Sequence, residues 1–307
     1  MIEPDLPAPL IEFAGAVPPA PEWFAAAIAD APERTKITVD GAAIELLTWG
    51  ERGKPGLLFL HGNGAHADWW SFIAPFFAAD HRVAAFSWSG MGRSDHRPTY
   101  SISGFVAEIF AAIDAAGLAE CGPPNIVAHS FGGYPMMAAA RDSGECFAAA
   151  VIVDTPFRAP GETLGAPPNA TNREHRVYPD IASALSRFRF APIQACANTF
   201  IADHIARGSL VAVTDGWSWR FDPYLWSRFA PGDAQTLLHA PRCPVALMWG
   251  ERSLLMTRDR LDGMLAALPS ASPAIAIPDA AHHVMVDQPL AFVSALRGLF
   301  AGWPQPL

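Results

Sequence analysis

Short apolar segments alternate with helix-like segments along most of the chain, and this alternation restricts the folds that it can adopt. The apolar segments lie at 56–60, 82–87, 125–128, 149–153, 245–249 and 274–277, and the helix-like segments at 68–79, 103–116, 131–141, 258–268 and 289–300. Strands that are apolar along their whole length are typical of a parallel sheet with helices on both faces. We therefore expect an α/β fold built on a mostly parallel sheet.

The part of the chain before these segments predicts a hairpin and an extension. The runs 35–40 and 42–49 flank Gly41, and Asp-Gly between two β-rich runs predicts the tight turn of a hairpin. Residues 1–33 are rich in proline and predict an irregular N-terminal extension with one short helix at 22–29.

The alternation stops between residues 156 and 238, where aromatic residues and arginines gather. This stretch of about 80 residues is too long for a loop in a compact domain. We expect a helical lid at 156–238 that covers the ends of the strands. The predicted α/β core then consists of residues 34–155 and 239–307.

Composition and charge narrow the classes of partner. The chain has 307 residues and is 51% hydrophobic, which is enough for one large core with an insertion. Its formal net charge is −9 and its 21 basic residues form no run, which argues against binding to nucleic acid.

The same sequence shows no sign of a membrane or of secretion. No run approaches the roughly 20 apolar residues that span a bilayer, and the start of the chain lacks the basic and apolar regions of a signal peptide. The four cysteines are scattered without CxxC spacing, which is typical of reduced thiols. We expect a soluble, cytoplasmic protein. The sequence does not decide between a monomer and a homodimer.

The segment AHSFGG places Ser130 where an apolar strand gives way to a helix. A nucleophile on such a sharp turn projects into the open, and its neighbours must be small, as Ala128 and Gly132 are. The N–H groups at the start of the helix favour developing negative charge. A Ser-Gly turn without chemistry is the alternative for this motif taken alone.

A serine nucleophile needs a base, because its hydroxyl reacts poorly near neutral pH. The segment IPDAAHHVMVDQP, residues 277–289, offers His282 in the loop between the last apolar segment and the last helix. The adjacent His283 is expected to point elsewhere. We predict that His282 is the base.

Several motifs in order resemble the α/β-hydrolase fold. They are HGNGA from His61, GMGRSD from Gly90, AHSFGG from Ala128, WGE from Trp249 and AHH from Ala281. The resemblance implies an eight-stranded type of sheet with a lid insertion. It also implies an oxyanion hole formed by the backbone N–H groups of Asn63 and Phe131.

The triad acid departs from the usual pattern of that family. Relatives place an Asp a few residues beyond the Trp-Gly-Glu strand end, whereas Ser253 stands there in this chain, and a hydroxyl cannot stabilise an imidazolium as a carboxylate does. Asp154, at the end of the segment 149–153, resembles the acid of a subset that includes some haloalkane dehalogenases and lactone hydrolases. Glu251 is an alternative acid, and Asp154 could be a turn-capping residue instead.

These residues predict a serine hydrolase that acts through an acyl-enzyme on Ser130, with His282 as base and Asp154 as acid. No metal or cofactor is expected, because His175, His204 and His239 lack ligand-like spacing. We expect a small apolar or aromatic ester or lactone as substrate. The expected substrate contacts are Trp69, Trp217, Trp219 and Arg158; Arg189 and Arg220 could also receive a carboxylate, although ion pairs would explain all three arginines equally well.

Two other functions compete with ester hydrolysis. The same fold and triad could cleave a carbon–carbon bond in a vinylogous diketone, which an arginine-rich pocket would favour. In a different class, the chain could be a small-molecule receptor on a hydrolase scaffold. A dehalogenase or epoxide hydrolase is disfavoured, because those relatives use Asp as the nucleophile and this chain has Ser130.

Overall fold

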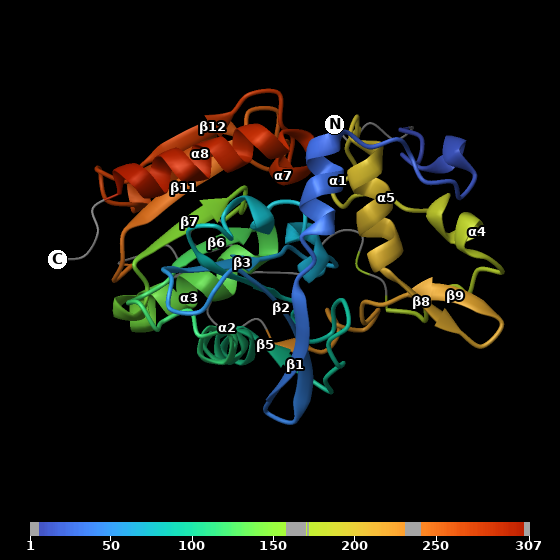
Figure 1. Ribbon diagram of the computed structural model, residues 1–307, viewed down its shortest axis with the longest axis horizontal. Helices are drawn as coiled ribbons and strands as arrows, with labels where there is room; N and C mark the ends of the chain where they lie inside the picture. Colours follow the sequence, from blue (N-terminus) through green and yellow to red (C-terminus); the bar gives the residue numbers. More distant parts are fainter. Residues whose placement is uncertain (1–5, 158–169, 171, 231–240, 304–307) are drawn as a thin grey trace.

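The computed structural model describes residues 6–157, 170, 172–230 and 241–303 and shows an eight-stranded sheet (Figure 1). The strand order is β1-β2-β4-β3-β6-β7-β11-β12. Their bounds are β1 Glu33–Val39, β2 Ala42–Trp49, β3 Gly56–Leu60, β4 Arg82–Phe86, β6 Asn125–His129, β7 Ala149–Val153, β11 Val245–Gly250 and β12 Ala274–Ile277. Strand β2 pairs antiparallel with β1 and β4, and all other neighbours in the sheet are parallel. The mostly parallel sheet is therefore confirmed.

Helices cover both faces of the sheet, as its apolar strands require. All residues of β3, β4 and β7 are buried. In Figure 1, α2 (Ile102–Ala116) and α3 (Gly133–Ser143) lie on one side, and α7 (Val284–Asp287) and α8 (Pro289–Gly302) on the other. Two further α-helices of the described residues are α1 (Glu22–Ala29), which lies before β1, and α6 (Arg258–Ala267), which lies between β11 and β12. None of the helices within the described ranges is long and apolar enough to cross a membrane.

The predicted hairpin is present and has the expected turn. Strands β1 and β2 pair from Glu33–Thr48 to Val39–Ala42. Asp40 and Gly41, between them, both have positive φ, at 45° and 79°. Left-handed conformations at both central residues match the twist of the two strands, which is why Asp-Gly is favoured there.

The helix expected at 68–79 is wrong. The chain forms two short 3-10 helices instead, η2 (Ala67–Trp70) and η3 (Ala74–Phe76). Pro75 has no N–H to donate and its ring clashes with the preceding turn, so an α-helix cannot continue through it. All four residues of η2 are buried, which ties this segment to the core.

The insertion between β7 and β11 contains more than helices. Its described part holds α4 (Ile181–Leu185), α5 (Thr199–Gly208), the antiparallel hairpin of β8 (Leu210–Val213) and β9 (Gly216–Trp219), and β10 (Phe229–Ala230). Strand β10 pairs in parallel with β5 (Tyr100–Ser101) of the core. Elements α4, α5, β8 and β9 lie together at one end of the molecule, on the right of the view (Figure 1).

Candidate active site

Ser130 lies directly after β6 and begins the 3-10 helix η4 (Ser130–Gly132), which leads into α3. Its φ of 52° is in the left-handed region, which is strained for a residue with a side chain. The turn needs small neighbours: a Cβ built on Gly132 would lie 2.8 Å from the His61 carbonyl oxygen. Thr155 Oγ1 donates a hydrogen bond of 2.8 Å to the Ser130 carbonyl and supports the turn.

His282 lies in the loop between β12 and α7 and contacts Ser130 directly. Its Nε2 is 2.9 Å from Ser130 Oγ, and its Nδ1 is 2.7 Å from Asp154 Oδ1. Because an ionised carboxylate can only accept, Nδ1 carries the proton and Nε2 is free to accept the hydroxyl proton. The loop is held by Asp287, whose Oδ2 accepts from the backbone N–H of Ala281 at 2.7 Å.

Asp154 follows β7 and is fully buried. Besides the hydrogen bond from His282, it accepts one from Ser253 Oγ at 2.7 Å and one from the Gly250 backbone N–H at 2.9 Å. The structure thus brings Asp154 to His282. Glu251 is exposed, and its backbone N–H donates to the Ile277 carbonyl.

The loop after β3 passes close above the nucleophile. His61 Nδ1 donates to the Gly62 carbonyl at 2.8 Å, and its Nε2 accepts from the Trp88 backbone N–H at 3.1 Å. Complete burial lowers the pKa of His61 to about 3, so the ring stays neutral. A Cβ on Gly62 would lie 3.1 Å from Ser130 Cβ, so a glycine allows the backbone at Asn63 to approach the reacting centre.

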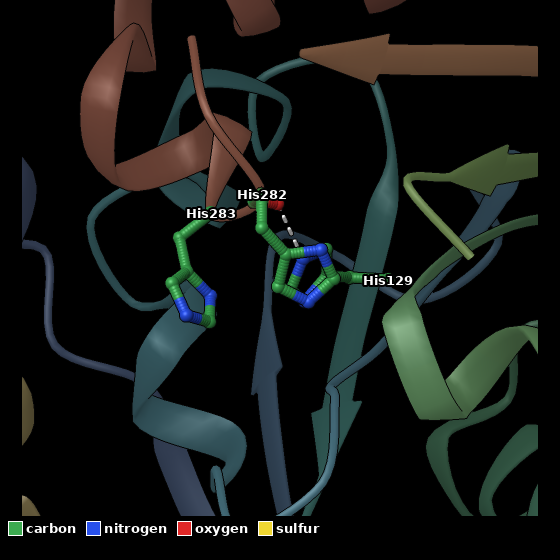
Figure 2. Close-up of side chains that lie close together, drawn as sticks. All are labelled: His129, His282 and His283. Atoms are coloured by element: carbon green, nitrogen blue, oxygen red, sulfur yellow. Dashed lines mark hydrogen bonds between the residues drawn. The ribbon is translucent and has the colours of Figure 1, made fainter. Parts of the chain in front are cut away.

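Three buried histidines meet beside Ser130. Figure 2 shows His283 next to His282, and His129 with its Nε2 directed at the His282 carbonyl, a hydrogen bond of 2.9 Å. One ring nitrogen from each lies within 4.8 Å of the others. Three imidazoles can ligate a metal ion. The ion would lie about 2.1 Å from each nitrogen, so the three nitrogens would have to be closer together than 4.8 Å. It would also take His282 Nε2 away from Ser130.

The buried histidines predict a steep loss of stability in acid. Burial lowers the pKa of His61 to about 3 and holds those of His129 and His283 well below their ordinary value. Below pH 6.5 the unfolded chain takes up protons that the folded chain cannot, so the free energy of unfolding falls as the pH falls. Each ring contributes up to about 1.4 kcal/mol per pH unit. Urea unfolding at pH 7.5, 6.0 and 5.0 measures the slope.

A matched pair of variants assigns this slope. His283 has ring contacts with Trp69 and Phe190 at 5.2 and 5.0 Å, so His283→Phe is expected to flatten the pH dependence by one proton. Ser294→Ala, which changes an exposed side chain on α8 without a titrating group, is the control and is expected to leave the slope unchanged. A free energy of unfolding that is the same at pH 7.5 and pH 5.0 would contradict the prediction.

A cavity of about 240 Å³ lies next to the triad, and His283, which follows the base in the chain, forms part of its wall. Its walls include Asn63, Trp69 and His283 from the core and Arg189, Trp219 and Trp226 from the insertion. Trp226 Nε1 donates to Asn63 Oδ1 at 3.1 Å, which joins the insertion to the loop after β3.

The cavity includes two of the four predicted substrate contacts, Trp69 and Trp219. Trp217 lies in β9, where its backbone exchanges two hydrogen bonds of 2.8 Å with Tyr178. Arg158 lies outside the described residues. Arg220 lies after β9, and burial lowers its pKa.

Among the residues at the site that the sequence did not predict, four stand out by their contacts. They are Ser253, which donates to Asp154; His129 and His283, which pack around His282; and Arg187, which lines the cavity. The sequence does contain one usable signal: β7 and β11 would be neighbours in the expected sheet, so residues after their carboxyl ends, such as Asp154 and Ser253, should meet.

Comparisons with known proteins bear on the family and the fold of the chain. The family model described as "Alpha/beta hydrolase family" matches residues 57–296. Proteins named Epoxide hydrolase 4 from Mus musculus and Homo sapiens are 31% and 30% identical to this chain over 101 residues. Those residues are 32% of this chain and 27% of each relative, so the match spans only about a quarter of the relatives' length.

Solved structures share the fold over most of the chain. A thioesterase domain from the curacin biosynthetic pathway has a TM-score of 0.73 at 23% identity and covers 87% of this chain and 99% of its own. E-2-(acetamidomethylene)succinate hydrolase has a TM-score of 0.76 at 20% identity, covering 88% and 100%. An esterase from Mycobacterium tuberculosis has a TM-score of 0.64 at 20% identity, covering 95% and 96%. At these identities the likeness concerns the fold alone.

Proposed function

The chain belongs to the alpha/beta hydrolase family, and from this premise we propose that it is a serine hydrolase that cleaves a small carboxylic ester or lactone. The observation that carries the proposal is the continuous hydrogen-bonded chain from Ser130 Oγ through His282 to Asp154, at 2.9 and 2.7 Å. A hydroxyl, an imidazole and a buried carboxylate in this order are the parts needed to activate a serine nucleophile.

The proposed reaction has two steps. Ser130 Oγ attacks the carbonyl carbon while His282 Nε2 takes its proton, and Asp154 stabilises the resulting imidazolium. The backbone N–H groups of Asn63 and Phe131 bind the oxyanion. His282 then gives the proton to the leaving alcohol. Water, activated by His282, attacks the acyl-enzyme and releases the acid, which restores Ser130.

The proposed lid, residues 156–238, supplies the aromatic wall of the cavity through Trp219 and Trp226. These side chains favour an apolar or aromatic substrate. The likeness to proteins named epoxide hydrolases does not carry the proposal, because it spans only about a quarter of those proteins' length.

Initial rates on p-nitrophenyl acetate, butyrate, hexanoate and octanoate test the proposal. We expect saturable hydrolysis and stoichiometric loss of activity with a fluorophosphonate, which labels an activated serine. If no ester is turned over and the fluorophosphonate does not react, ester hydrolysis is ruled out. Labelling without ester turnover would instead favour cleavage of a carbon–carbon bond, which is followed by the loss of absorbance of a vinylogous diketone.

A further inference from the structure

The cavity lined by Asn63 and His283, each close in the chain to a part of the proposed site, carries positive charge that no described carboxylate neutralises. Arg187 and Arg189 line it from the segment after α4, and both side chains are exposed. Arg189 Nη1 donates to the neighbouring Phe188 carbonyl at 3.0 Å. Among the described residues, neither arginine forms an ion pair, although the chain as a whole carries a net charge of −9.

Among the described residues of the cavity wall, the acidic one is Asp222, and its carboxylate already has hydrogen-bond partners. Asp222 is buried, and its Oδ2 accepts from Tyr100 Oη at 2.7 Å and from Arg228 Nη1 at 3.0 Å. Its Oδ1 accepts from the Tyr224 backbone N–H at 2.9 Å. The charge of Asp222 is thus balanced by Arg228, and the two other arginines are left for a ligand.

The core side of the cavity contributes polar atoms that lack partners. His283 is 4% exposed and Trp69 is 7% exposed, and both line the cavity. Within the described part of the chain, both ring nitrogens of His283 and Nε1 of Trp69 make no hydrogen bond. A buried polar group without a partner is costly, so such atoms point to a ligand that can supply hydrogen bonds.

The apolar part of the wall lies between these two sets of polar groups. Phe190 follows Arg189 in the chain, and its ring lies 5.0 Å from that of His283 and 5.8 Å from that of Trp69. A cavity of about 240 Å³ suits a small substrate. A substrate with its reacting group at Asn63 and its body against Phe190 would place its other end near Arg187 and Arg189.

We propose that the substrate is an acidic ester, in which a carboxylate bound by Arg187 and Arg189 is joined through a short apolar or aromatic body to the ester group at Ser130. The planar guanidinium groups match a carboxylate with paired hydrogen bonds. Phe190 and Trp219 pack against the body. This inference rests on the proposed function and names the substrate class for the same site.

Two matched substrate pairs test the inference. Mono-4-nitrophenyl adipate and 4-nitrophenyl methyl adipate differ in charge on the acyl side, and 4-acetoxybenzoate and methyl 4-acetoxybenzoate differ on the alcohol side. In at least one pair we expect kcat/KM to be about 10-fold or more higher for the acid than for its methyl ester, because charge-assisted hydrogen bonds are strong. The preference should shrink in 0.5 M NaCl, since exposed charges are screened.

The double variant Arg187→Ala/Arg189→Ala assigns the preference to these residues. It is expected to lower kcat/KM for the acidic ester about 10- to 100-fold and to leave the methyl ester within about twofold. Arg258→Ala is the matched control, because Arg258 is an exposed arginine on α6 that pairs with Asp262.

The outcomes separate the two proposals. Equal rates for acid and methyl ester in both pairs, or a preference that survives in the double variant, would overturn the acidic-substrate inference and leave the serine hydrolase in place. Absence of turnover for all four esters, together with no fluorophosphonate labelling, would overturn the proposed function and this inference with it.

Discussion

Replacing Ser130 with alanine is expected to lower kcat for p-nitrophenyl butyrate by about 10⁴- to 10⁶-fold, the range seen when an activated serine is removed from a triad. The size of the effect follows from the geometry. Ser130 Oγ lies within hydrogen-bond distance of His282 Nε2, so its loss leaves the base without a nucleophile to activate. Steady-state rates and fluorophosphonate labelling measure the change, and we expect both to disappear together.

The variant should fold as the wild type does. Within the described part of the chain, the Oγ of Ser130 makes its hydrogen bond with His282, and alanine tolerates the turn about as well as serine does. Circular dichroism and the melting temperature check this point. Ser294→Ala, an exposed serine on α8, is the control and should keep full activity. If Ser130→Ala retained more than a hundredth of the wild-type rate, the nucleophile would have to be another residue.

The sheet could be predicted from the sequence because burial on both faces leaves a simple signature. Strands β7 and β12 have the predicted bounds, 149–153 and 274–277, since each is a short apolar run with clear flanks. The hairpin β1–β2 followed from Asp40-Gly41 in the same way. These signals are local, so no knowledge of the rest of the fold is needed to interpret them.

The insertion also contains a local signal for a hairpin. Thr214 and Asp215 separate β8 from β9, and Asp215 and Gly216 have positive φ, at 68° and 150°. An Asp-Gly pair therefore occurs at both hairpins, although Gly216 is already the first residue of β9 whereas Gly41 lies in the turn itself. The helical lid is the expectation for 156–238 because the segment is too long for a loop, whereas the β-branched and aromatic residues on both sides of Asp215 favour strands.

Most of the cavity wall could not be predicted beyond Trp69 and Trp219, because it depends on contacts between distant segments. Phe188 and Phe190 are buried whereas Arg187 and Arg189 are exposed, but the alternation alone does not say which surface the arginines face. The contact of Phe190 with His283 joins distant parts of the chain, and only the folded chain reveals it. Substrate contacts were therefore the weakest part of the sequence prediction.

Asp154→Asn is expected to lower kcat by about 10⁴-fold, since the same change in other triads leaves the histidine in the wrong tautomer. The introduced amide would present either an NH₂ group to His282 Nδ1–H or a carbonyl oxygen without charge. Ser253 Oγ and the Gly250 N–H both donate to the Asp154 carboxylate, and an NH₂ group in place of one oxygen could not accept from them. Stopped-flow or steady-state rates on p-nitrophenyl butyrate measure the loss.

Glu251→Gln is the control for the acid, and its kcat is expected to stay within about twofold of wild type, because an exposed side chain away from the base contributes little. A large loss in Glu251→Gln with near-normal rates in Asp154→Asn would reverse the assignment. Such a result would mean that the acid occupies the more usual strand end after β11.

Substitutions at Ser253 test whether the carboxylate that pairs with His282 must come from position 154. Its Oγ lies 2.7 Å from Asp154 Oδ1, the oxygen that also accepts from His282 Nδ1. Ser253→Ala removes one donor and should lower kcat only about 10-fold, a typical effect for one hydrogen bond to a charged group. In the Asp154→Asn background, however, Ser253→Asp returns a carboxylate to the same end of the neighbouring strands and should recover part of the lost rate.

The same substitution is expected to have the opposite effect in the wild type. Ser253→Asp alone would place a second carboxylate beside Asp154, and two carboxylates so close and so deeply buried cannot both stay ionised. Ser253→Asp alone should therefore lower kcat relative to wild type, whereas the same substitution should raise kcat in the Asp154→Asn background. Recovery in the double variant together with a loss in the single variant would show that the base needs one carboxylate at this position and that either β7 or β11 can supply it.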